Sequence, residues 1–301
     1  MNTNPNAISQ NDFQNMKTND SCTLAAIPLL SRNVINIYSI ISDENFAIQY
    51  FINASDNLKG DLYNKFDFVS CGNKDYLIIL DNDSILVYEV PLKREIGFEE
   101  IKNFKKINLS IVSEDAFSNV RPRCLRISKF GCELYFGFIL GNYVVIDFLN
   151  LEDECNPTVL EVRRYHYKNG FVWFDFVKND DIYLLTKSNL FRKRLLLDRN
   201  EFHKNDRLIK TYSDFSATKK DIEFKTANIS PVNPSVVALY GTIKGFKNIF
   251  IFNNSHIAFT KINIEPISLQ WSSYGSDLYV VGKAKQYKIS NVYSDKLSIS
   301  S

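Results

Sequence analysis

The sequence is poor in the residues that most often build metal centres and disulfide frameworks. It has 5 cysteines and 3 histidines among 301 residues. The cysteines are odd in number, irregularly spaced and never arranged as CxxC, so we expect buried, reduced thiols. No histidine has a Cys, His or carboxylate nearby at ligand spacing, and we therefore expect neither a metal site nor a cofactor. The residues concerned are Cys22, Cys71, Cys124, Cys132, Cys155, His166, His203 and His256.

Long apolar runs are also lacking. No segment approaches the roughly 20 apolar residues that span a bilayer, and the Asn-rich residues 1–20 have no apolar core of the signal-peptide kind. We therefore expect an intracellular protein, in the nucleus or the cytoplasm, with no membrane partner. Residues 1–20 are predicted to be a disordered tail because they offer little to bury. Residues 21–299 are predicted to form one folded domain.

No charge of one sign prevails, and no local catalytic signature is found. The 36 Lys and Arg residues balance 34 Asp and Glu residues, for a formal charge of +2. This argues against a whole-protein electrostatic attraction to nucleic acid or anionic membrane. GxSxG, HExxH, P-loop and GxGxxG motifs are absent. We therefore expect that the protein is not an enzyme, unless carboxylates from distant loops meet in the fold.

Phenylalanine and tyrosine are abundant instead, with 23 Phe and 16 Tyr. Aromatic and β-branched side chains suit a half-buried pleated sheet. Five times, an apolar strand-like run is followed by a short polar or glycine turn and a second strand-like run. The copies begin at Leu77, Leu134, Ile182, Val236 and Leu278. Successive starts are therefore 57, 48, 54 and 42 residues apart, a period typical of a four-stranded propeller blade.

We predict an all-β fold, a single β-propeller of six or seven four-stranded blades. Neighbouring blades then cover both faces of each sheet, which explains strands that are apolar on both alternations, such as 76–80. Residues 22–52 are expected to form a first, degenerate blade. Within it, residues 23–30 could instead pair with the last blade and close the ring. Apolar side chains spaced three apart indicate a short helical insertion over residues 95–104.

Two stretches have the layout of WD repeats. Residues 267–289 contain a strand that ends in an aromatic residue and serine, a Gly-Ser-Asp turn, an apolar strand, a glycine and a final strand. Residues 124–147 follow the same order. The chain after residue 66 therefore resembles a degenerate WD-repeat propeller. No copy has the closing Trp-Asp pair or the preceding Gly-His pair.

One segment is strongly basic. Residues 187–210 contain eight Lys and Arg residues against three acidic ones, and two arginines lie on the strand before. Such an edge could bind phosphates or an acidic protein surface. Alternatively, its charges only protect a solvated edge from aggregation. The candidate binding residues are Arg163, Arg164, Lys187, Arg192, Lys193, Arg194 and Arg199.

Three functions remain open at this point. By analogy with WD-type propellers, the first is a non-catalytic scaffold that binds other protein subunits of an intracellular complex, through an acidic surface on the partner. The second is a nucleic-acid-associated accessory subunit that uses the basic edge 187–210. The third is a propeller enzyme or small-ligand binder with its site at the mouth of the central channel.

Overall fold

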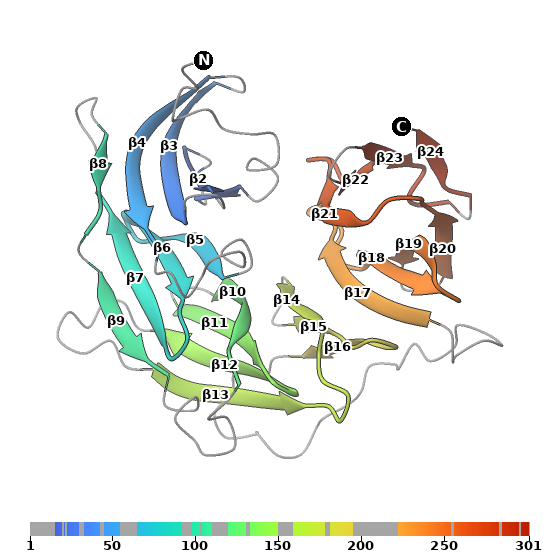
Figure 1. Cartoon of the computed structure of the whole chain (residues 1–301), viewed down its shortest axis with the longest axis horizontal. Helices are drawn as coiled ribbons and strands as arrows, with labels where there is room; N and C mark the ends of the chain where they lie inside the picture. The colour runs from blue at the N-terminus through green and yellow to red at the C-terminus, as the bar shows by residue number, and fades with distance from the viewer. Residues whose placement is uncertain are drawn as a thin grey trace. The chain divides into compact units, whose positions relative to one another are not determined.

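The chain folds as an all-β protein, with strands β1 to β24 arranged in six sheets among the described residues (Figure 1). The computed structural model describes residues 16–300 except 20, 22, 30–32, 43–44, 55–64, 92–97, 103, 110–119, 131–132, 150–158, 178–180, 195–221, 254–255, 283–284 and 295. The chain divides into two compact units, Met1–Tyr165 and His166–Ser301. Of the predicted tail 1–20, only residues 16–19 are described, and the division into tail and domain stays a prediction.

The first unit contains three sheets, with strand orders β1-β2-β3-β4-β8, β5-β6-β7-β9 and β10-β11-β12-β13. Neighbouring strands are antiparallel from β1 to β4, throughout the sheet of β5 to β9 and from β10 to β12, whereas β4 and β8 pair in parallel over two residues. The bounds are β1 Lys17–Thr18, β2 Leu24–Leu29, β3 Val34–Ser42, β4 Asn45–Asn53, β5 Phe66–Cys71, β6 Lys74–Leu80, β7 Ser84–Val90, β8 Glu99–Glu100, β9 Lys105–Asn108, β10 Arg123–Phe130, β11 Glu133–Leu140, β12 Tyr143–Leu149 and β13 Val159–His166.

The second unit also contains three sheets, with orders β14-β15-β16, β17-β18-β19-β20 and β21-β22-β23-β24. Each is an antiparallel meander in chain order. The bounds are β14 Trp173–Val177, β15 Asp181–Leu185, β16 Leu190–Arg194, β17 Ile222–Ile229, β18 Val236–Ile243, β19 Phe246–Asn253, β20 His256–Lys261, β21 Pro266–Trp271, β22 Leu278–Gly282, β23 Gln286–Ser290 and β24 Ser298–Ser300.

The middle sheet of each unit is apolar on both faces. In β6, Leu77 and Ile79 pack against the sheet of β2 to β4, whereas Ile78 and Leu80 pack against the sheet of β10 to β12. Successive side chains of a strand point to opposite faces, so a continuous apolar run feeds two cores at once. The two-sided burial predicted for strand 76–80 is therefore confirmed.

The second unit repeats this arrangement. In β18, Val237 and Leu239 pack against the sheet of β14 to β16, and Val236 and Ala238 pack against the sheet of β21 to β23. All four side chains are fully or almost fully buried. Sheets stacked in this way hold one another by apolar burial, without a Trp-Asp closure in any repeat.

Two local predictions are wrong. Leu24–Leu29 does not extend the last sheet: β2 lies between β1 and β3, so both its edges are occupied within the first sheet. The helical insertion expected over 95–104 is replaced, in its described part, by strand β8. The reason is that Phe98 stacks on Phe51 of β4, at 4.6 Å between ring centroids, while Ile101 is buried in the core. The apolar residues spaced three apart therefore pack beside strand β8 at the edge of the first sheet, and they do not form one face of a helix.

Substitutions at two phenylalanines of one strand test the two-faced packing of the middle sheets. Phe250 of β19 is 1% exposed in the core shared with β14 to β17, whereas Phe246 is 58% exposed. Phe250→Ala is expected to lower the free energy of unfolding by about 3–5 kcal/mol because it leaves a cavity. Phe246→Ala is expected to change it by only about 0.5 kcal/mol. Urea unfolding followed by fluorescence measures both, and equal losses would contradict this packing.

Candidate functional site: the lysine-rich end of the second unit

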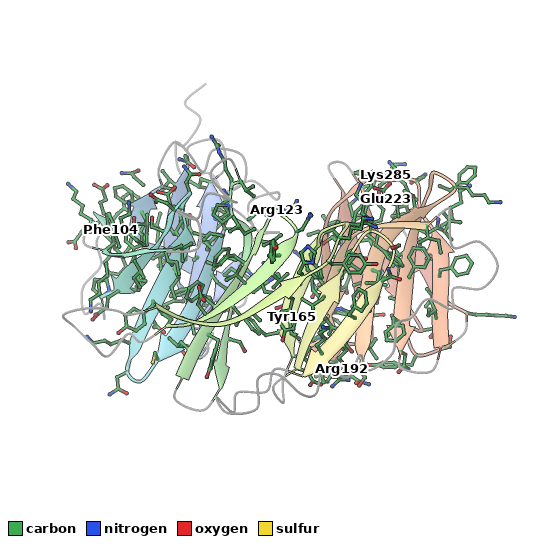
Figure 2. All side chains as sticks on the ribbon, turned by 90° about the horizontal axis from the view of Figure 1, so that it is seen from below. Phe104, Arg123, Tyr165, Arg192, Glu223 and Lys285 are labelled. Atoms are coloured by element: carbon green, nitrogen blue, oxygen red, sulfur yellow. The ribbon has the colours of Figure 1, made fainter. Side chains whose placement is uncertain are left out.

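The described part of the predicted basic edge extends along the β15–β16 hairpin, from its turn to its far end. Lys187 lies in the turn between β15 and β16, and the register pairs Leu185 with Leu190 beside this turn. At the far end of the hairpin Arg194 pairs with Asp181. Figure 2 shows Arg192 at the end of this unit opposite to that of Glu223, the ion-pair partner of Lys187. A run of basic residues along a strand is therefore spread over its length.

Two of the predicted residues already have acidic partners. Arg192 forms an ion pair with the nearly buried Asp181 at 2.6 Å and lies 5.7 Å above the Tyr183 ring, so it ties β15 to β16. Lys187 pairs with Glu223 at 3.0 Å.

For most of the other predicted residues, the structure does not describe the side chain. Arg163 and Arg164 lie on β13 of the first unit, and Lys193 and Arg194 lie on β16. The side chains of Arg163, Arg164 and Arg194 are outside the described part, as is all of Arg199. A partner-binding edge at these residues stays a prediction.

A different basic cluster gathers at the end of the second unit that holds Glu223. We call it the lysine-rich end. Its described charged residues are six lysines and two glutamates. These are Lys187, Lys225, Lys244, Lys247, Lys261, Lys285, Glu223 and Glu265.

Strand register brings these residues together from distant parts of the sequence. Thr242 of β18 lies between Glu223 of β17 and Lys247 of β19. The residue after Lys247 is Asn248, which is opposite Lys261 of β20. Lys244 forms the turn of the β18–β19 hairpin. The Gly282 N–H donates to the Lys285 carbonyl at 2.9 Å, in the β22–β23 hairpin next to the start of β21. Figure 2 shows Glu223 and Lys285 at the same end.

A β-bulge places Lys225 at this end. The register of β17 against β18 shifts between Phe224 and Thr226, so Lys225 is the extra residue of β17. Gly241 permits β17 and β18 to lie close together at the bulge, because a Cβ at this position would lie 2.6 Å from the Glu223 carbonyl oxygen. Because of the bulge, the Lys225 side chain does not follow the regular alternation of side chains along β17. The side chain reaches Glu265, which immediately precedes the next sheet.

Glu265 is the centre of the cluster. It immediately precedes β21, and three donors converge on its carboxylate. Tyr240 Oη donates to Oε2 at 2.8 Å, Lys225 Nζ donates to Oε1 at 3.2 Å, and Lys247 Nζ lies 3.3 Å from Oε2. Lys225 Nζ also lies 5.6 Å from the centroid of the Tyr240 ring. A carboxylate, two ammonium groups and a phenol are thus held together by β17, β18, β19 and the β20–β21 connection.

The protonation states follow from these contacts. Burial raises the pKa of Glu265, but the hydrogen bonds from Tyr240, Lys225 and Lys247 outweigh it and hold the pKa below its ordinary value. Burial, and then the hydrogen bond to Glu265, raise the pKa of Tyr240. At neutral pH the carboxylate is therefore ionised and the phenol is protonated. The site thus holds an ionised carboxylate, a weaker proton acceptor than a free glutamate because of its lowered pKa, beside two ammonium groups that can attract negative charge.

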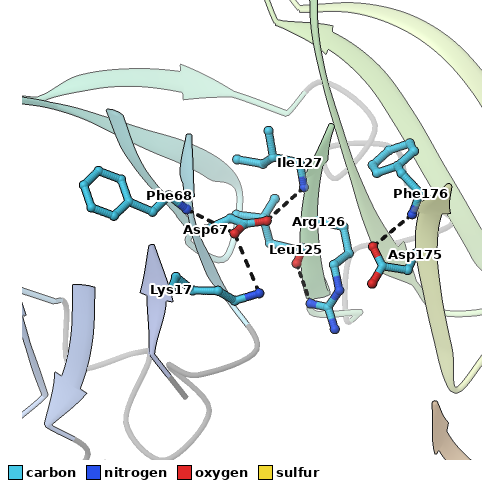
Figure 3. Close-up of polar contacts among 8 residues, drawn as sticks. All are labelled: Lys17, Asp67, Phe68, Leu125, Arg126, Ile127, Asp175 and Phe176. Atoms are coloured by element: carbon cyan, nitrogen blue, oxygen red, sulfur yellow. Dashed lines mark hydrogen bonds and ion pairs between the residues drawn. The ribbon is translucent and has the colours of Figure 1, made fainter. Parts of the chain in front are cut away.

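Other polar clusters have structural roles. Asp67 of β5 accepts hydrogen bonds from the N–H groups of Phe68 and Ile127, both at 3.1 Å, and lies 3.7 Å from Lys17 Nζ (Figure 3). It thereby joins β1, β5 and β10, which belong to the three sheets of the first unit. Asp277 accepts from Ser290 Oγ at 2.6 Å and pairs with Lys288 at 3.3 Å, which fixes the turn before β22.

The described residues contain neither a metal-ligand cluster nor a membrane-spanning helix. In that part of the chain, no three His, Cys, Asp or Glu side chains gather where they could hold a metal ion. It also contains no helix with the length and apolar character to cross a membrane.

Comparisons with known proteins show the fold. No protein-family model matches this chain, and no curated protein matches its sequence. A Bacteroides uniformis protein provisionally assigned as a 6-phosphogluconolactonase is similar in structure, with a TM-score of 0.59 and 12% identity over 94% of this chain and 82% of that one. The periplasmic gluconolactonase of Pseudomonas aeruginosa has a TM-score of 0.58 and 10% identity over the same shares. The WD40 domain of Toxoplasma gondii coronin has a TM-score of 0.55 and 12% identity, over 94% and 68%. The predicted propeller resemblance is thus confirmed at the level of the fold.

These comparisons contradict two predictions, that the protein is a non-catalytic scaffold and that it is not an enzyme. Proteins described as lactonases share the fold over nearly the whole chain, so a propeller with WD-like repeats does not indicate a scaffold. The absence of local catalytic motifs does not exclude an enzyme either. The Glu265 cluster is assembled from four separate segments and would leave no such motif.

Asp67 provides a test of how the sheets of the first unit are joined. Asp67→Asn puts an amide NH2 group where the carboxylate accepts two backbone N–H groups, and we expect it to cost about 1–3 kcal/mol of unfolding free energy. Asp83→Asn is the control. It removes an exposed carboxylate that pairs with Lys106 at 3.6 Å, and we expect a loss of about 0–1 kcal/mol. Urea unfolding at neutral pH measures both, and equal small losses would show that Asp67 joins nothing of consequence.

Tyr240→Phe tests the electrostatics of the Glu265 cluster. It removes one of three donors, so the pKa of Glu265 should rise. The lowered pKa in the folded state also means that Glu265 contributes stability above its unfolded-state pKa and loses it as the pH falls through its folded-state pKa. In the variant this loss should be smaller and should be complete at a higher pH, because only the folded-state pKa rises. A 13C NMR titration of the glutamate carboxyl groups measures the pKa. An unchanged value, or an equal rise in the control Tyr293→Phe, would contradict the assignment.

Proposed function

We propose that the protein is a propeller enzyme that hydrolyses a lactone, the cyclic ester of a sugar acid. The Glu265 cluster is the observation that carries this proposal. It places an ionised carboxylate between two ammonium groups at one end of the stacked sheets. The fold likeness to proteins described as lactonases supports the same class of reaction. In this proposal the six sheets of the described residues are the six blades of one propeller.

Lactone hydrolysis needs few catalytic groups. Water adds to the ring carbonyl carbon and loses a proton, and the carbonyl oxygen takes up negative charge. The ring C–O bond then breaks, and its oxygen receives a proton to give the open hydroxy acid. An enzyme therefore needs a proton acceptor for water, positive charge near the developing oxyanion, and a return path for the proton.

The residues of the cluster match these needs. The Glu265 carboxylate accepts the proton from water and returns it to the ring oxygen as that oxygen leaves. The ammonium groups of Lys225 and Lys247, both ion-paired with Glu265, provide positive charge for the oxyanion. Tyr240 donates to one carboxylate oxygen and Lys225 donates to the other, so the carboxylate is held in one orientation. Its raised pKa keeps it a donor across the neutral range.

Purified protein should open δ-gluconolactone or its 6-phosphate faster than the spontaneous reaction, as followed by acid release with a pH indicator. Glu265→Gln keeps the shape of the side chain and removes the proton acceptor, and we expect kcat/KM to fall about a hundredfold or more. Glu223→Gln is the matched control. Glu223 is a second lysine-paired glutamate at the same end, and its loss should leave kcat/KM almost unchanged.

Two results would contradict the proposal. In the first, the wild type adds nothing to the spontaneous rate for either lactone. In the second, Glu265→Gln and Glu223→Gln lower the rate equally, which would make the effect one of surface charge. Circular dichroism of each variant confirms that the fold is kept.

A further inference from the structure

We infer that the substrate of this site carries a phosphate group, and that the lysines without an acidic partner at the lysine-rich end bind it. The inference takes its reaction from the proposed function but its binding chemistry from the charges of this end. The fold likeness leaves the question open, since one similar structure is described as a 6-phosphogluconolactonase and another as a gluconolactonase.

Positive charge is concentrated at this end. Its described residues include six lysines and two glutamates, a surplus of four positive charges. The whole chain is nearly balanced, with a formal charge of +2. A balanced protein thus presents one strongly cationic end, the arrangement that attracts an anionic ligand.

The two glutamates do not neutralise this surplus. Glu223 is paired with Lys187, and Glu265 is shared by Lys225 and Lys247. The other three lysines are exposed, and none has an ion pair with a carboxylate among the described residues. These three are Lys244, Lys261 and Lys285.

The three lysines are held in place by the backbone around them. Lys244 and Gly245 form the β18–β19 turn with φ values of 49° and 79°, the positive values of a tight hairpin. The Lys261 ammonium group lies 4.1 Å from the centroid of the Phe246 ring, which follows that turn. Gly282 bonds to the Lys285 carbonyl, and a Cβ on Gly282 would lie 3.2 Å from the Glu265 carbonyl oxygen. The backbone of Lys285 therefore lies close to the backbone of Glu265.

Phosphate is the group that these charges suit. A phosphate monoester carries about −1.5 to −2 charges at neutral pH, and lysine binds it as a point charge. The lactone ring itself is neutral, so an unphosphorylated lactone gains nothing from three additional ammonium groups. Glu265 would also repel a carboxylate or a phosphate placed directly upon it. A ligand satisfies both conditions when its phosphate lies at Lys244, Lys261 and Lys285 and its neutral ring lies at Glu265.

Stable products allow the test to be made without turnover. We expect isothermal titration calorimetry to show that 6-phosphogluconate binds about tenfold or more tightly than gluconate, from which it differs only by the phosphate. The preference should shrink as salt is added. The variant Lys244→Gln/Lys261→Gln/Lys285→Gln should lose most of it. The control Lys74→Gln/Lys106→Gln/Lys296→Gln removes the same charge, from two lysines of the first unit and from the β23–β24 connection, and should keep it.

Three outcomes overturn the inference: equal binding of the two compounds, no binding of either, or equal losses in the two triple variants. The reaction and the phosphate preference can fail separately. Phosphate-selective binding without lactone hydrolysis would refute the reaction and support the anion site. Hydrolysis of both lactones at equal kcat/KM, with no preference between the two products, would support the reaction and refute the anion site.

Discussion

The structure depends on middle sheets that are buried on both faces. In β6 and β18 every consecutive side chain from Leu77 to Leu80 and from Val236 to Leu239 enters one of two cores. No position within these four-residue runs remains for a charged group. The Glu265 cluster lies outside them, where β17 begins, β18 ends and β21 begins.

The Glu265 cluster shows how such an end is made into a site. The bulge at Lys225 redirects one side chain, Gly241 gives the bulge room, and Tyr240 extends its hydroxyl group from the core to the carboxylate. Each device departs locally from regular sheet structure. Without the bulge, the Lys225 side chain would follow the regular alternation of β17 and would not be directed to Glu265.

Local features of this fold could be predicted from the sequence, because strands, hairpin turns and two-sided apolar runs are encoded by neighbouring residues. The Glu265 cluster could not, because Lys225, Tyr240, Lys247 and Glu265 meet only through strand register and a bulge. The basic run 187–210 shows the reverse relation between sequence and structure. Sequence neighbours such as Lys187 and Arg194 are separated by the length of a strand, and Arg192 is committed to Asp181.

In the proposed site, one end of the second unit binds an anionic substrate beside Glu265. An experimental structure with bound 6-phosphogluconate tests this most directly. We expect the phosphate among Lys244, Lys261 and Lys285, with the sugar chain directed toward the Glu265 carboxylate. A ligand bound at Arg192 and Lys193, or anywhere in the first unit, would contradict it.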